Sequence, residues 1–256
     1  MKPFRLLDCV VSRDGRELTL YQRGDAFYIQ IDGYDLMSSR AHGSEDALAR
    51  LALEALGTGG RGRSVKRRNR PPRILVGGLG MGFTLRAVLD LLGEASGPGQ
   101  GGATAGRDAE VVVAEAFPAV VEWNRGPLAH LAGRPLRDRR VHVVVGDVAD
   151  RLAEAAEGAE GHRPYDVILL DVDNGPEAIT LEGNSRLYTL RGLGQTFRAL
   201  TPGGVLAVWS ASNDPPFTDR LRRAGFEVAV RRARERACGK GATHVLFVAR
   251  RPAGYA

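Results

Sequence analysis

The sequence predicts an α/β fold in which helices cover both faces of a mostly parallel sheet, preceded by a small antiparallel sheet. From about residue 73 onward, short apolar segments rich in Val, Ile and Leu alternate with segments whose apolar residues have helical spacing. Continuous apolar strands are expected where both faces of a parallel sheet are buried. A glycine-rich loop follows the first of these strands, and an acidic residue ends the second. Together these observations predict a Rossmann-like nucleotide-binding domain.

Residues 1–56 are expected to form a β-rich segment that ends in a helix. Apolar residues at helical spacing predict this helix from Glu45 to Leu56, with Ser44 as its N-cap. Composition and intervening glycine turns predict three short strands before it, at residues 4–11, 16–21 and 27–31.

A basic, glycine-rich linker at residues 57–72 separates this segment from the α/β domain at residues 73–256. The stretch GTGGRGRSVKRRNRPP cannot bury a core, so we expect an exposed connection. Together with a net charge of +6, it raises the alternative of a nucleic-acid partner. No aromatic side chain interleaves these charges to stack on bases, which favours the solvated linker.

The α/β domain is expected to alternate five strands with five helices and to end in two further strands. The last two, at residues 226–231 and 243–249, are expected to pair as an antiparallel hairpin at the sheet edge. A glycine-rich insertion at residues 93–108 interrupts the alternation. The predicted strands are residues 74–77, 110–115, 141–146, 166–171 and 205–210, and the predicted helices are residues 83–92, 119–131, 152–156, 187–200 and 218–224.

Length and composition predict a globular protein without a membrane partner. Of the 256 residues, 43% are hydrophobic and 26% charged, and the only cysteines are Cys9 and Cys238. No apolar run approaches the roughly 20 residues that span a bilayer, and the charged N-terminal stretch does not resemble a signal peptide. We therefore expect a cytoplasmic protein with no disulfide framework and no cysteine-rich metal site.

The loop after the first strand of the α/β domain has the composition of a cofactor-binding turn. It lies in ILVGGLGMGFTLR, residues 74–86, between a predicted strand and a predicted helix. Gly78, Gly80 and Gly82 allow the backbone to turn sharply and to approach a ligand closely. Many α/β folds have such a turn, so the loop predicts a cofactor only in combination with other residues.

Acidic residues at three further strand ends supply that combination. Glu115 is placed to accept hydrogen bonds from both ribose hydroxyls of an adenosine cofactor. Asp147, after the third strand, could accept a hydrogen bond from the adenine amino group. Asp171 and Asp173 lie two residues apart, so in an extended segment their side chains face the same way. Such a pair can hold an amine or take its proton. Any one of them alone is equally typical of an exposed strand end.

At this point the chain resembles the spermidine/spermine synthase family of aminopropyltransferases, over most of residues 27–248. The resemblance lies in the glycine loop, in the strand ending at Glu115 and in the motifs IDGYDLMSSR, GDVAD, YDVILLDVDNGP and LTPGGVLAVWS. It implies an N-terminal β-domain followed by the Rossmann-like fold of class I S-adenosylmethionine-dependent transferases, often dimeric through the N-terminal sheet. It also implies that Glu115 binds ribose, that Asp147 contacts adenine and that Asp171 activates an amine.

The chain departs from this family where the aminopropyl group would bind. The family's loop aspartate, in GGGDGG, binds the amine of the donor and falls on Met81 here. The family's donor-contacting Gln falls on Leu36, and its Tyr and adjoining His or Gln fall on Glu45 and Asp46. Methionine cannot pair with an ammonium group, and a buried ammonium without a partner costs several kcal/mol. Decarboxylated S-adenosylmethionine is therefore expected to be a poor donor.

The leading hypothesis is a transferase that uses S-adenosylmethionine, foremost a methyltransferase acting on a small-molecule or amine acceptor. Its catalysis would consist mainly of positioning the acceptor in line with the sulfonium methyl group. Asp171 and Asp173 are the predicted catalytic residues, and Asn174 and Tyr188 are predicted to line the acceptor site.

Two alternatives stay open. The first is an aminopropyltransferase of polyamine biosynthesis that uses decarboxylated S-adenosylmethionine, with Glu45 or Asp46 replacing the missing donor contacts. The second is a non-catalytic module that docks nucleic acid or another partner through residues 61–73.

Overall fold

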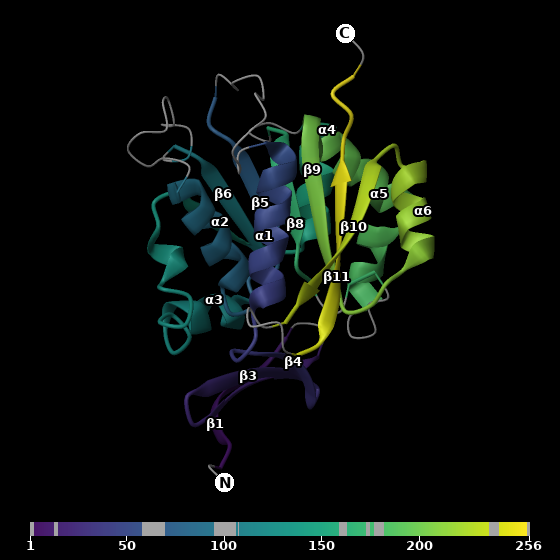
Figure 1. Ribbon diagram of the computed structural model, residues 1–256. Coiled ribbons are helices and arrows are strands. Elements are labelled where there is room, and N and C mark those ends of the chain that lie inside the picture. The colour runs from purple at the N-terminus through teal and green to yellow at the C-terminus, as the bar shows by residue number, and fades with distance from the viewer. Residues whose placement is uncertain are drawn as a thin grey trace.

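The computed structural model describes residues 3–12, 15–57, 70–94, 106, 108–158, 163–172, 175–176, 182–235 and 241–254. Within these residues the chain forms a four-stranded antiparallel sheet and a seven-stranded sheet flanked by helices (Figure 1). This arrangement confirms the predicted α/β architecture with a small N-terminal sheet.

The N-terminal sheet has the strand order β1-β2-β3-β4. Its strands are β1 (Arg5–Val11), β2 (Glu17–Arg23), β3 (Ala26–Ile31) and β4 (Tyr34–Ser38). Leu18 and Leu20 on β2 and Ile29 on β3 are buried in the same core cluster as α1 and α2. The sequence analysis missed β4, which a two-residue turn with positive φ at Asp32 and Gly33 joins to β3.

The large sheet has the strand order β10-β11-β9-β8-β5-β6-β7. Its strands are β5 (Arg73–Gly77), β6 (Glu110–Glu115), β7 (Val141–Val145), β8 (Tyr165–Leu170), β9 (Leu200–Ser210), β10 (Glu227–Arg234) and β11 (Thr243–Arg250). Strands β5 to β9 are parallel, and β11 is antiparallel to both β9 and β10, as the predicted hairpin requires. The order reverses at β5, which lies between β6 and β8, and such a switch point is where α/β sheets bind ligands.

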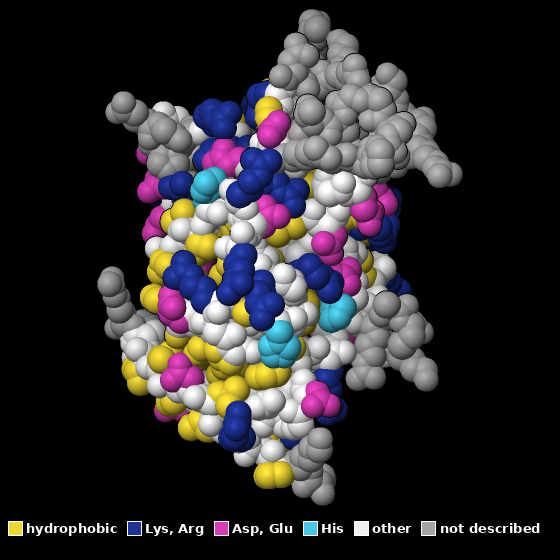
Figure 2. All heavy atoms as spheres, turned by 90° about the vertical axis from the view of Figure 1, so that its left-hand side faces the viewer, with side chains coloured by type: hydrophobic (Ala, Val, Ile, Leu, Met, Phe, Trp, Pro, Cys, Tyr) yellow, Lys and Arg dark blue, Asp and Glu magenta, His cyan; other side chains and the backbone are white. Residues whose placement is uncertain are grey.

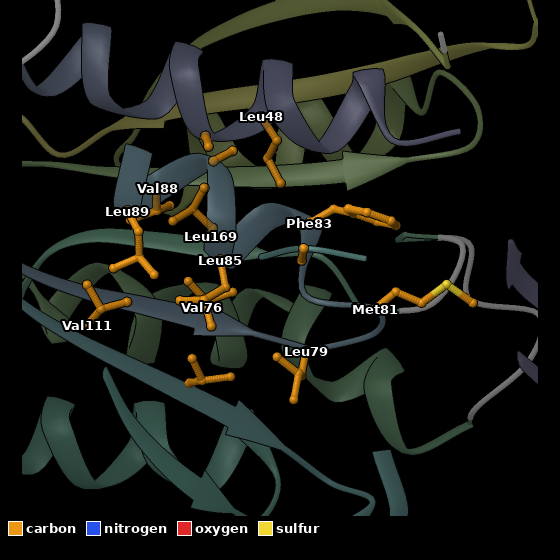
Figure 3. Packing of buried hydrophobic residues seen from close by; sticks show 14 of the residues in the cluster. Leu48, Val76, Leu79, Met81, Phe83, Leu85, Val88, Leu89, Val111 and Leu169 are labelled. Carbon is orange, nitrogen blue, oxygen red and sulfur yellow. The ribbon is translucent and has the colours of Figure 1, made fainter. Parts of the chain in front are cut away.

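Helices cover both faces of this sheet (Figure 1). They are α1 (Gly43–Leu56), α2 (Phe83–Glu94), α3 (Pro118–Arg125), α4 (Val148–Glu157), α5 (Leu190–Ala199) and α6 (Pro215–Arg223), with 3-10 turns η1 (Pro135–Arg137) and η2 (Glu182–Tyr188). Successive residues of β5 face opposite sides, because Ile74 and Val76 pack with α1, α2 and α3 whereas Leu75 packs with α4, α5 and α6. Figure 3 shows part of the core on the α1, α2 and α3 side, including Leu48 of α1 and Val88 of α2.

Three details of the helices differ from the sequence analysis. The helix expected to reach residue 131 ends at Arg125, because Gly126 precedes a proline that has no backbone N–H. The helix expected over residues 187–200 is divided into η2 and α5 at Thr189, whose hydroxyl caps α5. Ser44 was wrongly predicted as an N-cap: α1 begins at Gly43, and its capping position, His42, makes no side-chain cap.

The surface changes in character along the molecule. Figure 2 shows hydrophobic side chains gathered toward the end that the N-terminal sheet forms, with basic side chains spread over the remainder of that face. The exposed hydrophobic residues of this sheet are Phe4, Leu6, Val11 and Tyr34. Among the described residues, no helix has the length and apolar character needed to cross a membrane. The division of the chain near residues 56 and 73 stays a prediction, and most of the basic linker lies outside the described residues.

Candidate active site

A cavity of about 180 Å³ lies at the carboxyl ends of β5, β6, β7 and β8. The sequence analysis predicted five of the residues that line it: Gly78, Gly80, Glu115, Asp147 and Asp171. The N-terminal sheet closes another side with apolar residues of β2, β3 and β4: Leu18, Ile29, Leu36 and Met37. The structure thus brings the glycine loop and three strand-end carboxylates to one enclosed place.

A larger depression, of about 610 Å³, is an open hollow on the N-terminal sheet. Its lining comes from the β2–β3 turn, residues 23–26, and from Ser39 and Arg40. It contains none of the strand-end residues, so the smaller cavity at the switch point is the candidate site despite its size.

The first two glycines of the loop hold the backbone close to the cavity. Gly78 has a φ of +88°, and a Cβ there would lie 2.4 Å from the carbonyl oxygen of Asp171. Gly80 has a φ of +51°, and its Cβ would lie 2.6 Å from the terminal methyl group of Met37. Gly82 does not line the cavity, because it faces Asn124 and Pro135. Gly82 therefore contributes to packing rather than to the cavity wall.

The Glu115 carboxylate is fixed by two backbone N–H groups. Leu79 donates to Oε2 at 2.8 Å, and Phe117 donates to Oε1 at 2.9 Å. The side chain is buried and lines the cavity. Since a carboxylate oxygen can accept more than one hydrogen bond, this geometry holds the group ready to receive ligand hydroxyls without reorienting.

Asp147 has a structural role that the sequence analysis did not predict. It is the N-cap of α4, with Oδ1 accepting from the Ala149 N–H at 2.7 Å. Its Oδ2 accepts from Arg186 at 2.6 Å, and Arg186 also contacts Asp150 at 3.0 Å. Hydrogen bonds and charge from these carboxylates raise the pKa of Arg186. A ligand that contacts Asp147 therefore meets a carboxylate already held by a cation.

Two further carboxylates, from distant parts of the chain, share the cavity. Asp171 accepts a hydrogen bond from Thr84 at 2.5 Å, and burial raises its pKa against the effect of that bond. Glu45, in the first turn of α1, also lines the cavity. Burial, followed by the negative charge of Asp171, raises the pKa of Glu45 to about 7. Because two neighbouring buried carboxylates resist joint ionisation, the pair favours a bound proton or a bound cation.

Of the remaining predicted site residues, the structure describes Tyr188 alone. Tyr188 is buried with its ring edge-on to that of Phe217, the ring centroids being 5.5 Å apart, and it does not line the cavity. Asp173 and Asn174 lie outside the described residues. Met81 is buried in the core, and Figure 3 shows it among the buried hydrophobic side chains.

Two lining residues that carry polar side-chain groups were not anticipated from the sequence. Trp209 lies near the end of β9, and its buried indole N–H has no hydrogen-bond partner among the described residues. Asn184 comes from η2. The position of Trp209 near the end of a sheet strand was the available signal, because it follows the same rule that identified the acidic residues.

The charged side chains of the lining are all acidic. Among the described residues, Glu45, Glu115, Asp147 and Asp171 line the cavity, whereas no Lys, Arg or His does. The described part of the chain also contains no cluster of three or more His, Cys, Asp or Glu side chains suited to a metal ion. The cavity therefore matches a ligand that is polar at one end and positively charged at the other.

The comparison with known sequences gives one group of relatives, and no family model matches the chain. The polyamine aminopropyltransferase of Mycobacterium tuberculosis is 28% identical over 205 residues, which are 80% of this chain and 31% of that protein. The chain thus spans about a third of the length of the curated relatives it matches.

Solved structures with the same fold fall into two groups. The spermidine synthase of Thermotoga maritima has a TM-score of 0.66 at 17% identity, covering 98% of this chain and 74% of that chain. A spermidine synthase in complex with the transition state analogue AdoDATO has a TM-score of 0.65 at 17% identity, covering 98% of this chain and 73% of that chain. Human methyltransferase-like protein 13, in complex with SAH, has a TM-score of 0.51 at 22% identity, covering 80% and 78%. These likenesses confirm the Rossmann-like transferase fold.

Proposed function

Taking the chain as a divergent spermidine synthase-like protein, as its sequence and fold likenesses support, we propose that it is an aminopropyltransferase. In this proposal it transfers the aminopropyl group of decarboxylated S-adenosylmethionine to a small amine, in the cytoplasm. The observation that carries the proposal is the purely acidic charge of the described cavity lining. Both the donor, with a sulfonium and an ammonium group, and a protonated amine acceptor suit such a lining.

The choice of donor follows from electrostatics. Ordinary S-adenosylmethionine carries a carboxylate at the end where the decarboxylated donor has none. A carboxylate about 4 Å from another costs on the order of 4 kcal/mol at an effective dielectric constant of about 20. The described lining offers no cation to offset that repulsion. The cavity therefore favours the decarboxylated donor.

This conclusion reverses the order of the hypotheses drawn from the sequence. Methyl transfer came first there because Met81 occupies the position of the family's donor-binding aspartate. Met81 is buried and does not line the cavity, but Glu45 brings a carboxylate to the cavity from α1. Together with Asp171, Glu45 can therefore supply the negative charge that the glycine loop lacks.

Each group would then have one task. The Glu115 carboxylate, held by two backbone N–H groups, would accept the ribose hydroxyls, and Gly78 and Gly80 would admit the nucleoside close to the backbone. Asp171 would hold positive charge on the substrates, and Glu45 would face the acceptor amine. Catalysis would come mainly from alignment of the acceptor nitrogen with the methylene carbon bonded to sulfur.

Methyl transfer is the second candidate, and one observation favours it. The indole N–H of Trp209, which has no partner in the described part of the chain, is the kind of donor that a carboxylate of S-adenosylmethionine requires. A methyltransferase would use the same nucleoside contacts and would place the methyl group toward Asp171.

Mass spectrometry of the products distinguishes the two reactions. The protein is incubated with each donor and with linear diamines of increasing length. The proposal expects acceptors enlarged by one aminopropyl group, formed only from the decarboxylated donor. Asp171→Asn should lose this activity, whereas Glu157→Gln, a change at an exposed residue near the end of α4, should keep it. Methylated products formed only from S-adenosylmethionine would overturn the proposal.

A further inference from the structure

A chain of hydrogen bonds leads from the cavity to His244, the second residue of β11. Glu45 lines the cavity, and its Oε2 accepts a hydrogen bond from the Ser44 hydroxyl at 2.6 Å. The Ser44 oxygen lies 3.0 Å from Nδ1 of His244. Ser44 is only 1% exposed, whereas His244 is half-buried. The three side chains therefore connect an enclosed carboxyl group to an imidazole that reaches the surface.

The orientation of Ser44 is not explained by the needs of the helix. A serine at the N-cap accepts a hydrogen bond from a backbone N–H of the first turn, but Ser44 is the second residue of α1. Here α1 has no side-chain cap, and the Ser44 hydroxyl is directed to Glu45 and His244 instead. A hydroxyl group has one proton and two acceptor positions, so it can accept a proton from one neighbour while it donates its own to another.

We propose that Glu45 takes the proton that the acceptor amine loses, and that Ser44 and His244 carry it out of the cavity. This inference rests on the proposed function, because it assigns the proton path of that same reaction. Glu45 touches the substrate and is a catalytic residue in this scheme, whereas Ser44 and His244 act through it.

The protonated acceptor amine gives one proton to the Glu45 carboxylate, which frees the nitrogen lone pair. This pair forms a bond to the methylene carbon next to the sulfonium, the carbon–sulfur bond breaks, and its electron pair stays on sulfur as a neutral thioether. Glu45 then passes its proton to the Ser44 oxygen as Ser44 passes its own to Nδ1 of His244. The imidazole releases one proton to water.

Burial and the charges around Glu45 favour its uptake of the proton. Glu45 faces Asp171 and Asp46, and both raise its proton affinity. Asp46 is held in turn by His42 and Arg86.

At the outer end of the path, burial lowers the pKa of His244 against the opposing charge of Glu235. The ring is therefore neutral near pH 7. In the tautomer with its proton on Nε2, the ring accepts from Ser44 at Nδ1 once protonated Glu45 donates to the Ser44 oxygen, and its low pKa favours release of a proton to water.

Asp171 is the less suitable proton acceptor. Its hydrogen-bond donor is Thr84, which is 3% exposed, so this bond leads into the core rather than toward solvent. We assign Asp171 the task of holding the positive charge, and Glu45 the task of taking the proton.

The test compares turnover of His244→Ala, Ser44→Ala and wild type, with His142→Ala on β7 as the control. The inference expects kcat to fall about tenfold or more in the first two variants, which is less than the roughly hundredfold or greater loss typical of removing the base itself, while KM for the donor stays unchanged. Added imidazole should restore most of the activity of His244→Ala and should leave His142→Ala unaffected. A residue with only a structural role would show no such rescue.

Three outcomes would overturn the inference, and they are distinguishable. Wild-type turnover in both folded variants would refute the relay and leave the proposed function intact. A reduced His244→Ala rate without imidazole rescue, or raised KM values with unchanged kcat, would assign a structural role instead. No product from wild type with any amine would refute the proposed function itself. Circular dichroism establishes folding, and Ser44→Ala, the smaller change, decides the matter if His244→Ala does not fold.

Discussion

Replacement of Glu45 by glutamine should make the protein more stable at pH 8 and should flatten its dependence of stability on pH. The pKa of Glu45 is about 7 in the folded protein, compared with 4.5 for an unperturbed glutamate. Between these values the folded state binds more protons than the unfolded state. The free energy of unfolding therefore falls as the pH rises from about 4.5 to about 7.

The size of the effect follows from the difference between the two pKa values. A change from 4.5 to about 7 corresponds to about 3 kcal/mol, which is a large part of the total stability of a typical domain. Glutamine keeps an oxygen that can accept from Ser44 but has no charge to bury beside Asp171. It also relieves Asp171 of a like charge, so the gain at high pH includes both carboxyl groups.

Urea unfolding measured from about pH 5 to about pH 8 tests this prediction. The stability difference between Glu45→Gln and wild type should grow by about 3 kcal/mol across this range in favour of the variant. Glu54→Gln serves as the control, since Glu54 lies on the same helix, is exposed and pairs with Arg50 at 3.0 Å. Equal pH dependence in wild type and Glu45→Gln would refute the buried carboxylate pair.

Three further predictions concern the cavity wall. Gly78→Ala should lose more than about 3 kcal/mol of stability in the same urea assay, because the new Cβ would collide with the backbone of Asp171. Gly33→Ala is the control: Gly33 has a similar φ of +79° but open space around it, so this variant should lose about 1 kcal/mol. Arg186→Ala should bind methylthioadenosine a few-fold more tightly in calorimetry, because it frees a cavity carboxylate, and unchanged affinity would argue against adenine contact there. Nucleoside binding should change the intrinsic fluorescence, and Trp209→Phe should abolish that change while Trp123→Phe should preserve it.

The fold was predictable because its signals are local. Strands such as β8 are buried on both faces, so they read as unbroken apolar runs, and the terminal hairpin of β10 and β11 has strand composition. The strand missed, β4, depends on the turn at Asp32 and Gly33. None of its residues is fully buried, so its sequence, YDLMS, lacks the continuous apolar run of a buried strand.

The site was predictable where it depends on strand ends. Parallel strands bring their carboxyl ends to one edge, so Glu115, Asp147 and Asp171 meet without further information. Glu45 comes from a helix, and only the packing of α1 against the large sheet brings it to Asp171. Tyr188 failed to reach the cavity because the expected helix breaks at Thr189, which leaves the ring in the core.

The central claim, that the cavity holds the nucleoside of a sulfonium donor through Glu115, is tested most directly by calorimetric titration with methylthioadenosine. Wild type should bind it, and Glu115→Ala should bind it roughly ten- to a hundredfold more weakly, as the loss of hydrogen bonds to a charged group implies. Equal binding by the two proteins, or no binding by wild type, would contradict the account.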